Sequence, residues 1–123
     1  MEVLLDTNFI ISCIMKRIDF LDELNSMGFK VRVPREVLQE MKDLRKESKV
    51  SHEERTAIDI AFDLLNGKKM KKIKVGGKNV DDGLIKKGQA GAYIATLDRE
   101  IKRNVQNRIV ILSAQNKLGV ERS

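Results

Sequence analysis

The chain has 123 residues, of which 41% are hydrophobic and 34% charged, and its net charge is +6. This balance is typical of one folded domain spanning residues 1–123 rather than of a disordered chain. The sequence shows no membrane-spanning run and no secretion signal, so we expect a cytoplasmic protein without a membrane partner. A single cysteine (Cys13) and a single histidine (His52) exclude an internal disulfide framework and a zinc site built from Cys and His ligands.

The charge is divided unevenly along the chain. Residues 1–66 carry 10 basic and 13 acidic side chains, whereas residues 67–123 carry 14 basic and 5 acidic ones. A strongly basic half beside an acidic half suggests a polyanionic partner. The basic half opens with a lysine-rich stretch that consists of Lys68, Lys69, Lys71, Lys72, Lys74 and Lys78.

Short apolar segments alternate with segments of helical periodicity along the chain. We expect strands over residues 2–5, 29–33, 70–75, 92–96 and 108–112. We expect helices over residues 9–15, 19–27, 35–46, 53–65, 81–87 and 98–105, with Pro34 in a first turn and a fraying tail after Ser113. Short, continuously apolar strands are typical of parallel sheets, so the pattern predicts a three-layer α/β/α sandwich with a mostly parallel sheet of about five strands.

Acidic residues stand where a parallel sheet places its functional sites, beyond the carboxyl ends of the strands. Asp6 follows the first predicted strand and Asp98 follows the fourth. Glu40 borders the apolar stripe of its helix, and Asp81 matches the buried edge of its helix better than Asp82 does. Singly, each acid also suits a helix cap, a first-turn charge or a surface ion pair. Together they predict a carboxylate cluster that a hard divalent cation, Mg²⁺ or Mn²⁺, would neutralise.

Four segments resemble the PIN-domain family and occur in the family's order. They are LLDTNFII at 4–11, VPREVLQEM at 33–41, VDDGLIKKG at 80–88 and YIATLDREIKRN at 93–104. The resemblance implies a parallel sheet flanked by helices, and a metal-dependent nuclease with three or four acidic residues at its site. Carried over by position, the catalytic and metal-binding acids are Asp6, Glu40, Asp81, with Asp82 as its alternative, and Asp98.

The same resemblance assigns supporting residues beside two of the acids. Thr7 or Asn8 is expected to help hold Asp6, and Thr96 is expected to support Asp98. The implied reaction is hydrolysis of RNA phosphodiester bonds by water that Mg²⁺ or Mn²⁺ activates, because a bound metal lowers the pKa of its water and offsets charge at phosphorus. No usable histidine pair is present for a metal-free ribonuclease mechanism.

Two subgroups of the family compete. The pairing of DDGLI with ATLDREIKRN is similar to PIN proteins of ribosomal RNA processing, the archaeal and Fcf1/Utp24 type, whereas the compact length also suits the toxin nucleases of VapBC pairs. A non-catalytic RNA-binding assembly factor of the same fold is a third interpretation. The partners implied are RNA, an antitoxin or ribosome-assembly protein, and a second copy of the chain. An apolar patch would serve the contact between copies, although the same residues also suit the core: Phe9, Ile10, Phe20 and Leu24.

Basic residues near the predicted acids are candidates for contact with the RNA backbone. Few aromatic side chains are present, so stacking platforms for bases are not evident and recognition of shape and backbone is expected. The candidate RNA-binding residues are Lys68, Lys69, Lys71, Lys72, Lys86, Lys87, Arg99, Lys102 and Arg103.

Overall fold

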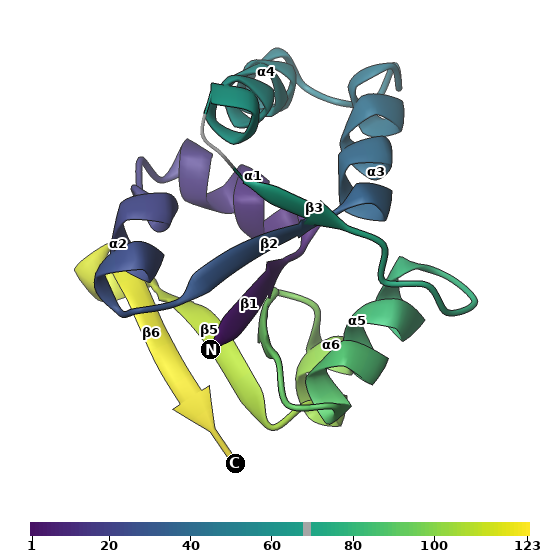
Figure 1. The fold of residues 1–123 in the computed structure, drawn as a ribbon. Coiled ribbons are helices and arrows are strands. Elements are labelled where there is room, and N and C mark those ends of the chain that lie inside the picture. The colour runs from purple at the N-terminus through teal and green to yellow at the C-terminus, as the bar shows by residue number, and fades with distance from the viewer. Residues whose placement is uncertain (68–69) are drawn as a thin grey trace.

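The computed structural model describes residues 1–67 and 70–123 and contains one six-stranded sheet in the order β3-β2-β1-β4-β5-β6 (Figure 1). The strands are β1 (Glu2–Leu5), β2 (Lys30–Pro34), β3 (Lys71–Ile73), β4 (Tyr93–Ala95), β5 (Asn107–Leu112) and β6 (Lys117–Arg122). The helices are α1 (Thr7–Met15), α2 (Phe20–Ser26), α3 (Arg35–Arg45), α4 (His52–Gly67), α5 (Val80–Gln89) and α6 (Arg99–Asn104), with a 3-10 turn η1 (Ser113–Gln115). Strands β1 to β5 pair in parallel, and β6 pairs antiparallel with β5.

Alternation of side chains along β1 divides the hydrophobic core between the two faces of the sheet. Val3 and Leu5 are buried in the larger cluster, together with side chains of α1, α2, α3 and α4. Leu4 points to the opposite face and is buried with Leu84 of α5 and Ile101 of α6. Figure 1 shows α5 and α6 side by side, apart from α1, α3 and α4. The predicted three-layer α/β/α sandwich is therefore confirmed.

A close approach at Gly88, near the end of α5, holds this helix against the sheet and α6. Gly88 has no side chain, and a Cβ atom added there would lie 2.3 Å from Val105 Cγ1 and 3.1 Å from Ile94 Cγ1. A larger residue at position 88 would push α5 away from the sheet and from α6. Since α5 carries the Asp81 and Asp82 pair in its first turn, this contact helps to set the position of both carboxylates.

The expectation that the tail frays after Ser113 is wrong, and the sheet has six strands rather than about five. Residues 117–122 form β6, in which Leu118 is 3% exposed. The backbone N–H of Leu118, on the outer edge of β6, donates to Glu23 Oε1 of α2 at 2.9 Å. The guanidinium of Arg122 lies over the Tyr93 ring, and its Nε donates to the Tyr93 hydroxyl at 2.5 Å. Pairing with β5, together with these tertiary contacts, makes the polar segment an edge strand.

Two smaller expectations also change. Pro34 is the last residue of β2 and the N-cap of α3, so the strand runs into the helix without a loop. The four residues suggested for a contact between two copies are core residues, each at most 1% exposed, so that patch is not available on the surface: Phe9, Ile10, Phe20 and Leu24. Among the described helices, none has the length and apolar character that a membrane crossing requires.

Candidate active site

The site begins at the carboxyl end of β1, which lies between β2 and β4 in the sheet. The strands that follow β1 in the chain are added first on one side of it, as β2 and β3, and then on the other side, as β4 and β5. Parallel sheets form ligand sites at such switch points. Asp6 follows β1 directly, and its backbone N–H donates to the carbonyl of Ala95 at the end of β4. The Asp6 side chain is nearly buried, with 6% of the residue exposed. This backbone contact places Asp6 over the junction of the two strands.

Two hydrogen bonds hold the Asp6 carboxylate. Its Oδ1 accepts from the backbone N–H of Thr7 at 2.9 Å, which caps the start of α1. Its Oδ2 accepts from the Thr96 hydroxyl at 2.7 Å. Thr96 is fully buried, and its Oγ1 also accepts from the backbone N–H of Asp98 at 3.0 Å. Thr96 therefore connects two of the predicted acids, and it contacts the Asp6 side chain as well as the backbone of Asp98.

Thr7 connects a third acid to the same place. Its hydroxyl donates to Glu40 Oε1 at 2.7 Å, so the carboxylate on α3 is held beside the start of α1. The stripe of apolar residues that buries Val37 and Met41 sets the rotation of α3 and leaves Glu40 at its border. The Thr7 hydroxyl thus contacts Glu40, whereas the Thr7 backbone supports Asp6.

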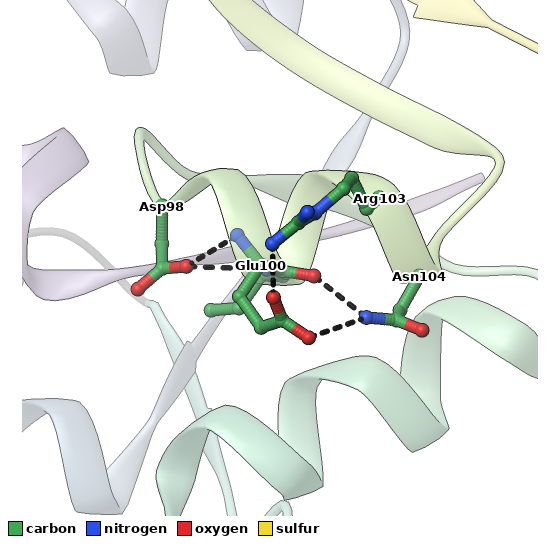
Figure 2. Close-up of polar contacts among 5 residues, drawn as sticks. Asp98, Glu100, Arg103 and Asn104 are labelled. Atoms are coloured by element: carbon green, nitrogen blue, oxygen red, sulfur yellow. Dashed lines mark hydrogen bonds and ion pairs between the residues drawn. The ribbon is translucent and has the colours of Figure 1, made fainter.

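Asp98 lies at the N-cap of α6. Its Oδ1 accepts from the backbone N–H groups of Glu100 at 2.8 Å and Ile101 at 3.2 Å (Figure 2). Such capping is the structural role that this residue type favours, and the same side chain also lines the cavity described below. The two roles are compatible because a carboxylate offers two oxygens and the cap hydrogen bonds use Oδ1.

The neighbouring aspartates of α5 differ in their surroundings. Asp82 Oδ2 accepts from the backbone N–H of Lys78 at 3.0 Å and forms an ion pair with Lys86 at 3.2 Å. These contacts, the backbone one first, hold the pKa of Asp82 below its usual value. Asp81 lines the acidic cavity instead. Its pKa is raised, first by partial burial and then by the nearby charge of Asp98. The structure thus brings Asp81, and not Asp82, to the other acids.

All four predicted acids line one cavity of about 380 Å³ at the carboxyl end of the sheet. Thr7, Asn8 and Leu44 also line it. Asn8 is exposed at the rim, beside the acid that it was expected to support. The cavity wall contains two further carboxylates that the sequence analysis missed, Asp43 and Glu47. Asp43 stands three positions after Glu40, on the same side of α3, and that spacing was the available signal, whereas Glu47 lies beyond the end of the helix at Arg45.

The acids repel one another across this cavity. Asp6 has its pKa raised to about 6, mainly because burial penalises the charged form. The hydrogen bonds from Thr96 and Thr7 oppose that rise, and the charges of Glu40 and Asp81 add to it. None of the four predicted acids takes part in an ion pair within residues 1–67 and 70–123. The cavity is therefore a concentration of negative charge without a basic partner in that part of the chain.

The donor chemistry fits a hard divalent cation, since every ligand on offer is an oxygen and the repulsion among the acids would be relieved by positive charge. The geometry is not preformed. Among the described side chains, no group of three or more Asp, Glu, His and Cys stands close enough together to hold a metal ion. Glu40 is held by the Thr7 hydroxyl, whereas the Asp81 side chain is exposed at the cavity and has room to turn toward the other acids.

The described candidate RNA-binding residues lie on three elements, β3, α5 and α6, and none of them lines the acidic cavity. Lys71 and Lys72 are exposed on β3, and Lys86 and Lys87 are exposed in the last turn of α5. Lys68 and Lys69 lie outside the described residues. The remaining three candidates lie on α6, next to Asp98: Arg99, Lys102 and Arg103.

The comparisons with known proteins agree with this fold. A family model described as a PIN like domain matches residues 3–115, and the chain belongs to that family. The structure of the PIN domain endonuclease Utp24 is similar at a TM-score of 0.73 and 22% identity, over 99% of this chain and 92% of that one. VapBC2 from Rickettsia felis, solved bound to a promoter DNA fragment, is similar at a TM-score of 0.50 and 17% identity, over 85% and 96%. The search of curated proteins found no match.

Proposed function

We propose that this PIN-like domain is an endoribonuclease that depends on Mg²⁺ or Mn²⁺. The observation that carries the proposal is the convergence of four acids from four separate segments on one cavity, with no basic partner in the described residues. A cluster of this kind weakens the fold unless it serves a cation, as unpaired and partly buried carboxylates repel one another. Membership of the PIN-like family supports the same conclusion.

The proposed metal ligands are Asp6, Glu40, Asp81 and Asp98. When bound, the divalent cation supplies an activated water and offsets negative charge at phosphorus. The protein holds two of these ligands in place: Thr96 and the Thr7 backbone orient Asp6, and the Thr7 hydroxyl orients Glu40. The Asp98 cap contacts fix that residue relative to α6. These hydrogen bonds preorganise the site, while the exposed side chains complete it on binding.

RNA is the proposed substrate because basic side chains on β3, α5 and α6 are available to hold a polyanion that the acidic centre alone would repel. In the lysine-rich stretch, Lys71 and Lys72 are the exposed side chains on the edge strand β3, next to β2. On α5, Lys87 remains available, whereas Lys86 is paired with Asp82. A role in ribosomal RNA processing, which the sequence resemblance to the Fcf1/Utp24 type implies, is the proposed biological setting, with RNA and an assembly protein as partners in the cytoplasm.

A toxin role with an antitoxin partner is the second candidate, and the likeness to VapBC2 is the observation that favours it. The likeness to Utp24 covers more of this chain and has the higher TM-score, so we place ribosomal RNA processing first. Co-expression with a neighbouring small DNA-binding protein tests the difference. Growth arrest on expression of this chain alone, relieved by that neighbour, would establish the toxin role.

The central experiment is cleavage of single-stranded and structured RNA with Mg²⁺, Mn²⁺ or EDTA. We expect Asp6→Asn and Asp81→Asn to reduce the cleavage rate by about a thousandfold or more, as for other members of a catalytic unit. Asp82→Asn is the matched control, since it makes the same change one position away, and it should leave the rate within about threefold. Activity that survives both EDTA and Asp6→Asn would overturn the mechanism. Tight RNA binding without cleavage under either metal would identify an assembly factor.

A further inference from the structure

A second cavity, of about 390 Å³, adjoins α6 and has a wall of opposite charge. Among the described residues, its lining consists of Arg99, Lys102 and Arg103. Side chains at these positions share one face of a helix, as residues three and four apart are neighbours there. The cavity is therefore a compact group of three cations formed by a single element.

This basic cavity is fixed relative to the acidic one by the helix between them. Asp98, which caps α6, lines the acidic cavity, and the cations follow it within the next five residues. At a rise of about 1.5 Å per residue, Lys102 and Arg103 lie about 6–8 Å along the helix axis from the cap. Ile101 is fully buried beneath the helix and anchors it to the core. The two cavities thus adjoin the same helix, the acidic one at its Asp98 cap and the basic one along the face that begins at Arg99.

We propose that Arg99, Lys102 and Arg103 bind the phosphate next to the one that is cleaved, on the same single strand of RNA. The inference rests on the proposed function and assigns this cavity a part in it. Guanidinium groups bind phosphate oxygens with paired hydrogen bonds, and lysine adds a point charge. The scissile phosphate lies at the acids and needs a metal ion, whereas its neighbour needs only these side chains. The cavity contacts the backbone and not the bases, so it reads no sequence.

Glu100 is a built-in competitor of the phosphate for one of these cations. Its carboxylate is paired with the guanidinium of Arg103, and Asn104 Nδ2 donates to the Glu100 carbonyl at 2.8 Å and to Oε1 at 3.4 Å (Figure 2). Binding of a phosphate would draw Arg103 away from this partner. Removal of the Glu100 charge should therefore strengthen binding, while removal of the cations should weaken it. Opposite changes in RNA affinity from substitutions at adjacent positions of one helix are what an anion-binding site predicts.

The first test measures the affinity for a fluorescent single-stranded uridine oligomer by anisotropy, in EDTA so that no cleavage occurs. The variant Arg99→Gln/Lys102→Gln should bind roughly tenfold more weakly, and the slope of log K against log salt should fall by about one or more. Glu100→Gln should bind about twofold to threefold more tightly. A thymidine oligomer of the same length should lose the same factor in the double variant, since the phosphate and not the 2′-hydroxyl is contacted.

The matched control is Lys30→Gln/Lys117→Gln, which removes the same charge from exposed positions on β2 and β6, away from both cavities. The inference is overturned if the two double variants bind within twofold of each other, if Glu100→Gln weakens binding, or if the unaltered protein fails to bind the oligomer at low salt. Failure of the nuclease proposal gives a different result. In that case the binding differences persist although the unaltered protein cleaves nothing with either metal.

Steady-state cleavage provides a second, independent readout. Because the α6 cations do not touch the reacting atoms, the double variant should raise KM by about tenfold and change kcat by less than about threefold. An unaltered KM in a protein that still cleaves would overturn this inference and leave the proposed nuclease function intact. Circular dichroism should show that both double variants keep the fold, as all four positions are at the surface or partly exposed.

Discussion

The two ends of the sheet differ in how their acidic side chains are compensated. At the amino end, Glu2 of β1 pairs with Arg32 of β2 at 2.8 Å, and Glu121 of β6 pairs with Arg108 of β5 at 3.3 Å. At the carboxyl end, Asp6, Glu40 and Asp98 accept hydrogen bonds from threonine hydroxyls or backbone N–H groups, and no acid that lines the 380 Å³ cavity forms an ion pair in the described residues.

The difference separates charges that stabilise the fold from charges that weaken it. An exposed pair such as that of Glu2 contributes little, yet its sign is favourable. The buried Asp6 carboxylate is held with a raised pKa of about 6, which means that the fold favours its neutral form. Near neutral pH the ionised form therefore costs stability, and the proposed cation would offset that cost. Stability sacrificed at one end of a sheet is the pattern expected of a functional site.

The largest expected effect on stability comes from Asp6→Asn. A folded-state pKa near 6 against 3.8 unfolded means that Asp6 favours folding most below pH 4, and that this advantage is lost as pH rises through 6. In EDTA at pH 7.5, the variant should therefore be more stable than the unaltered protein by about 2–3 kcal/mol. The gain should vanish near pH 4, as urea unfolding at several pH values will show.

A control for that result is Asp82→Asn, which alters the neighbour of the site acid Asp81 on α5. Its pKa is lowered by Lys78 and Lys86, so its ionised form favours folding and the substitution should reduce stability at pH 7.5. Should both variants shift stability in the same direction, the proposed difference between the site acids and the other acids would be wrong.

Divalent cations should restore the stability that the ionised acids cost at the carboxyl end of the sheet. A cation that binds only the folded protein stabilises it by about 2.7 kcal/mol when present at a hundred times its Kd. We expect Mn²⁺ and Mg²⁺ to raise the Tm of the unaltered protein at pH 7.5, and to leave the Tm of Asp6→Asn unchanged, as measured by differential scanning fluorimetry. A rise of equal size in both proteins would place the binding elsewhere.

Thr96→Val tests how the fold tolerates the Asp6 charge. The substitution keeps the shape but removes the hydroxyl that donates to Asp6 Oδ2 and accepts from the Asp98 N–H. Leaving these buried groups without partners should reduce stability by about 2 kcal/mol at pH 7.5. The loss should be smaller in an Asp6→Asn background, because an uncharged side chain costs less to leave unpaired. A double-mutant cycle of urea unfolding measures this coupling, and additivity would contradict it.

Sequence reasoning located the acids that a strand end or a buried helix face defines. Asp6 and Asp98 follow apolar strands, Glu40 borders an apolar stripe, and the phase of α5 separates Asp81 from Asp82. The convergence of these acids in one cavity agrees with that reasoning, while their roles in catalysis and metal binding stay predictions.

The parts that sequence reasoning missed depend on distant contacts. The polar β6 segment forms a strand by pairing with β5 along its whole length, and burial of Leu118 and the contact of its N–H with Glu23, 95 residues away in the chain, hold that strand in place. Asp43 and Glu47 are exposed, so no apolar pattern distinguishes them from other surface acids. The rotation of α3 brings Asp43 to the cavity, and the chain that follows the helix brings Glu47 there. For Phe9 and Phe20 the sequence left open whether the side chain belongs to the core or to a contact with a second copy, because an apolar residue alone does not show what covers it.

The smallest expected effect belongs to the amino end of the sheet. Glu2→Gln removes the ion pair with Arg32, in which the Glu2 side chain is 49% exposed and the Arg32 side chain 17% exposed. The stability at pH 7.5 should fall by about 0.5 kcal/mol, the usual value of an exposed pair, and added salt should reduce that difference. Opposite signs for Glu2→Gln and Asp6→Asn in the same urea titration would support the contrast between the two ends. A gain in stability from Glu2→Gln would show that its charge, too, is held at a cost, and the amino end would then need a ligand of its own.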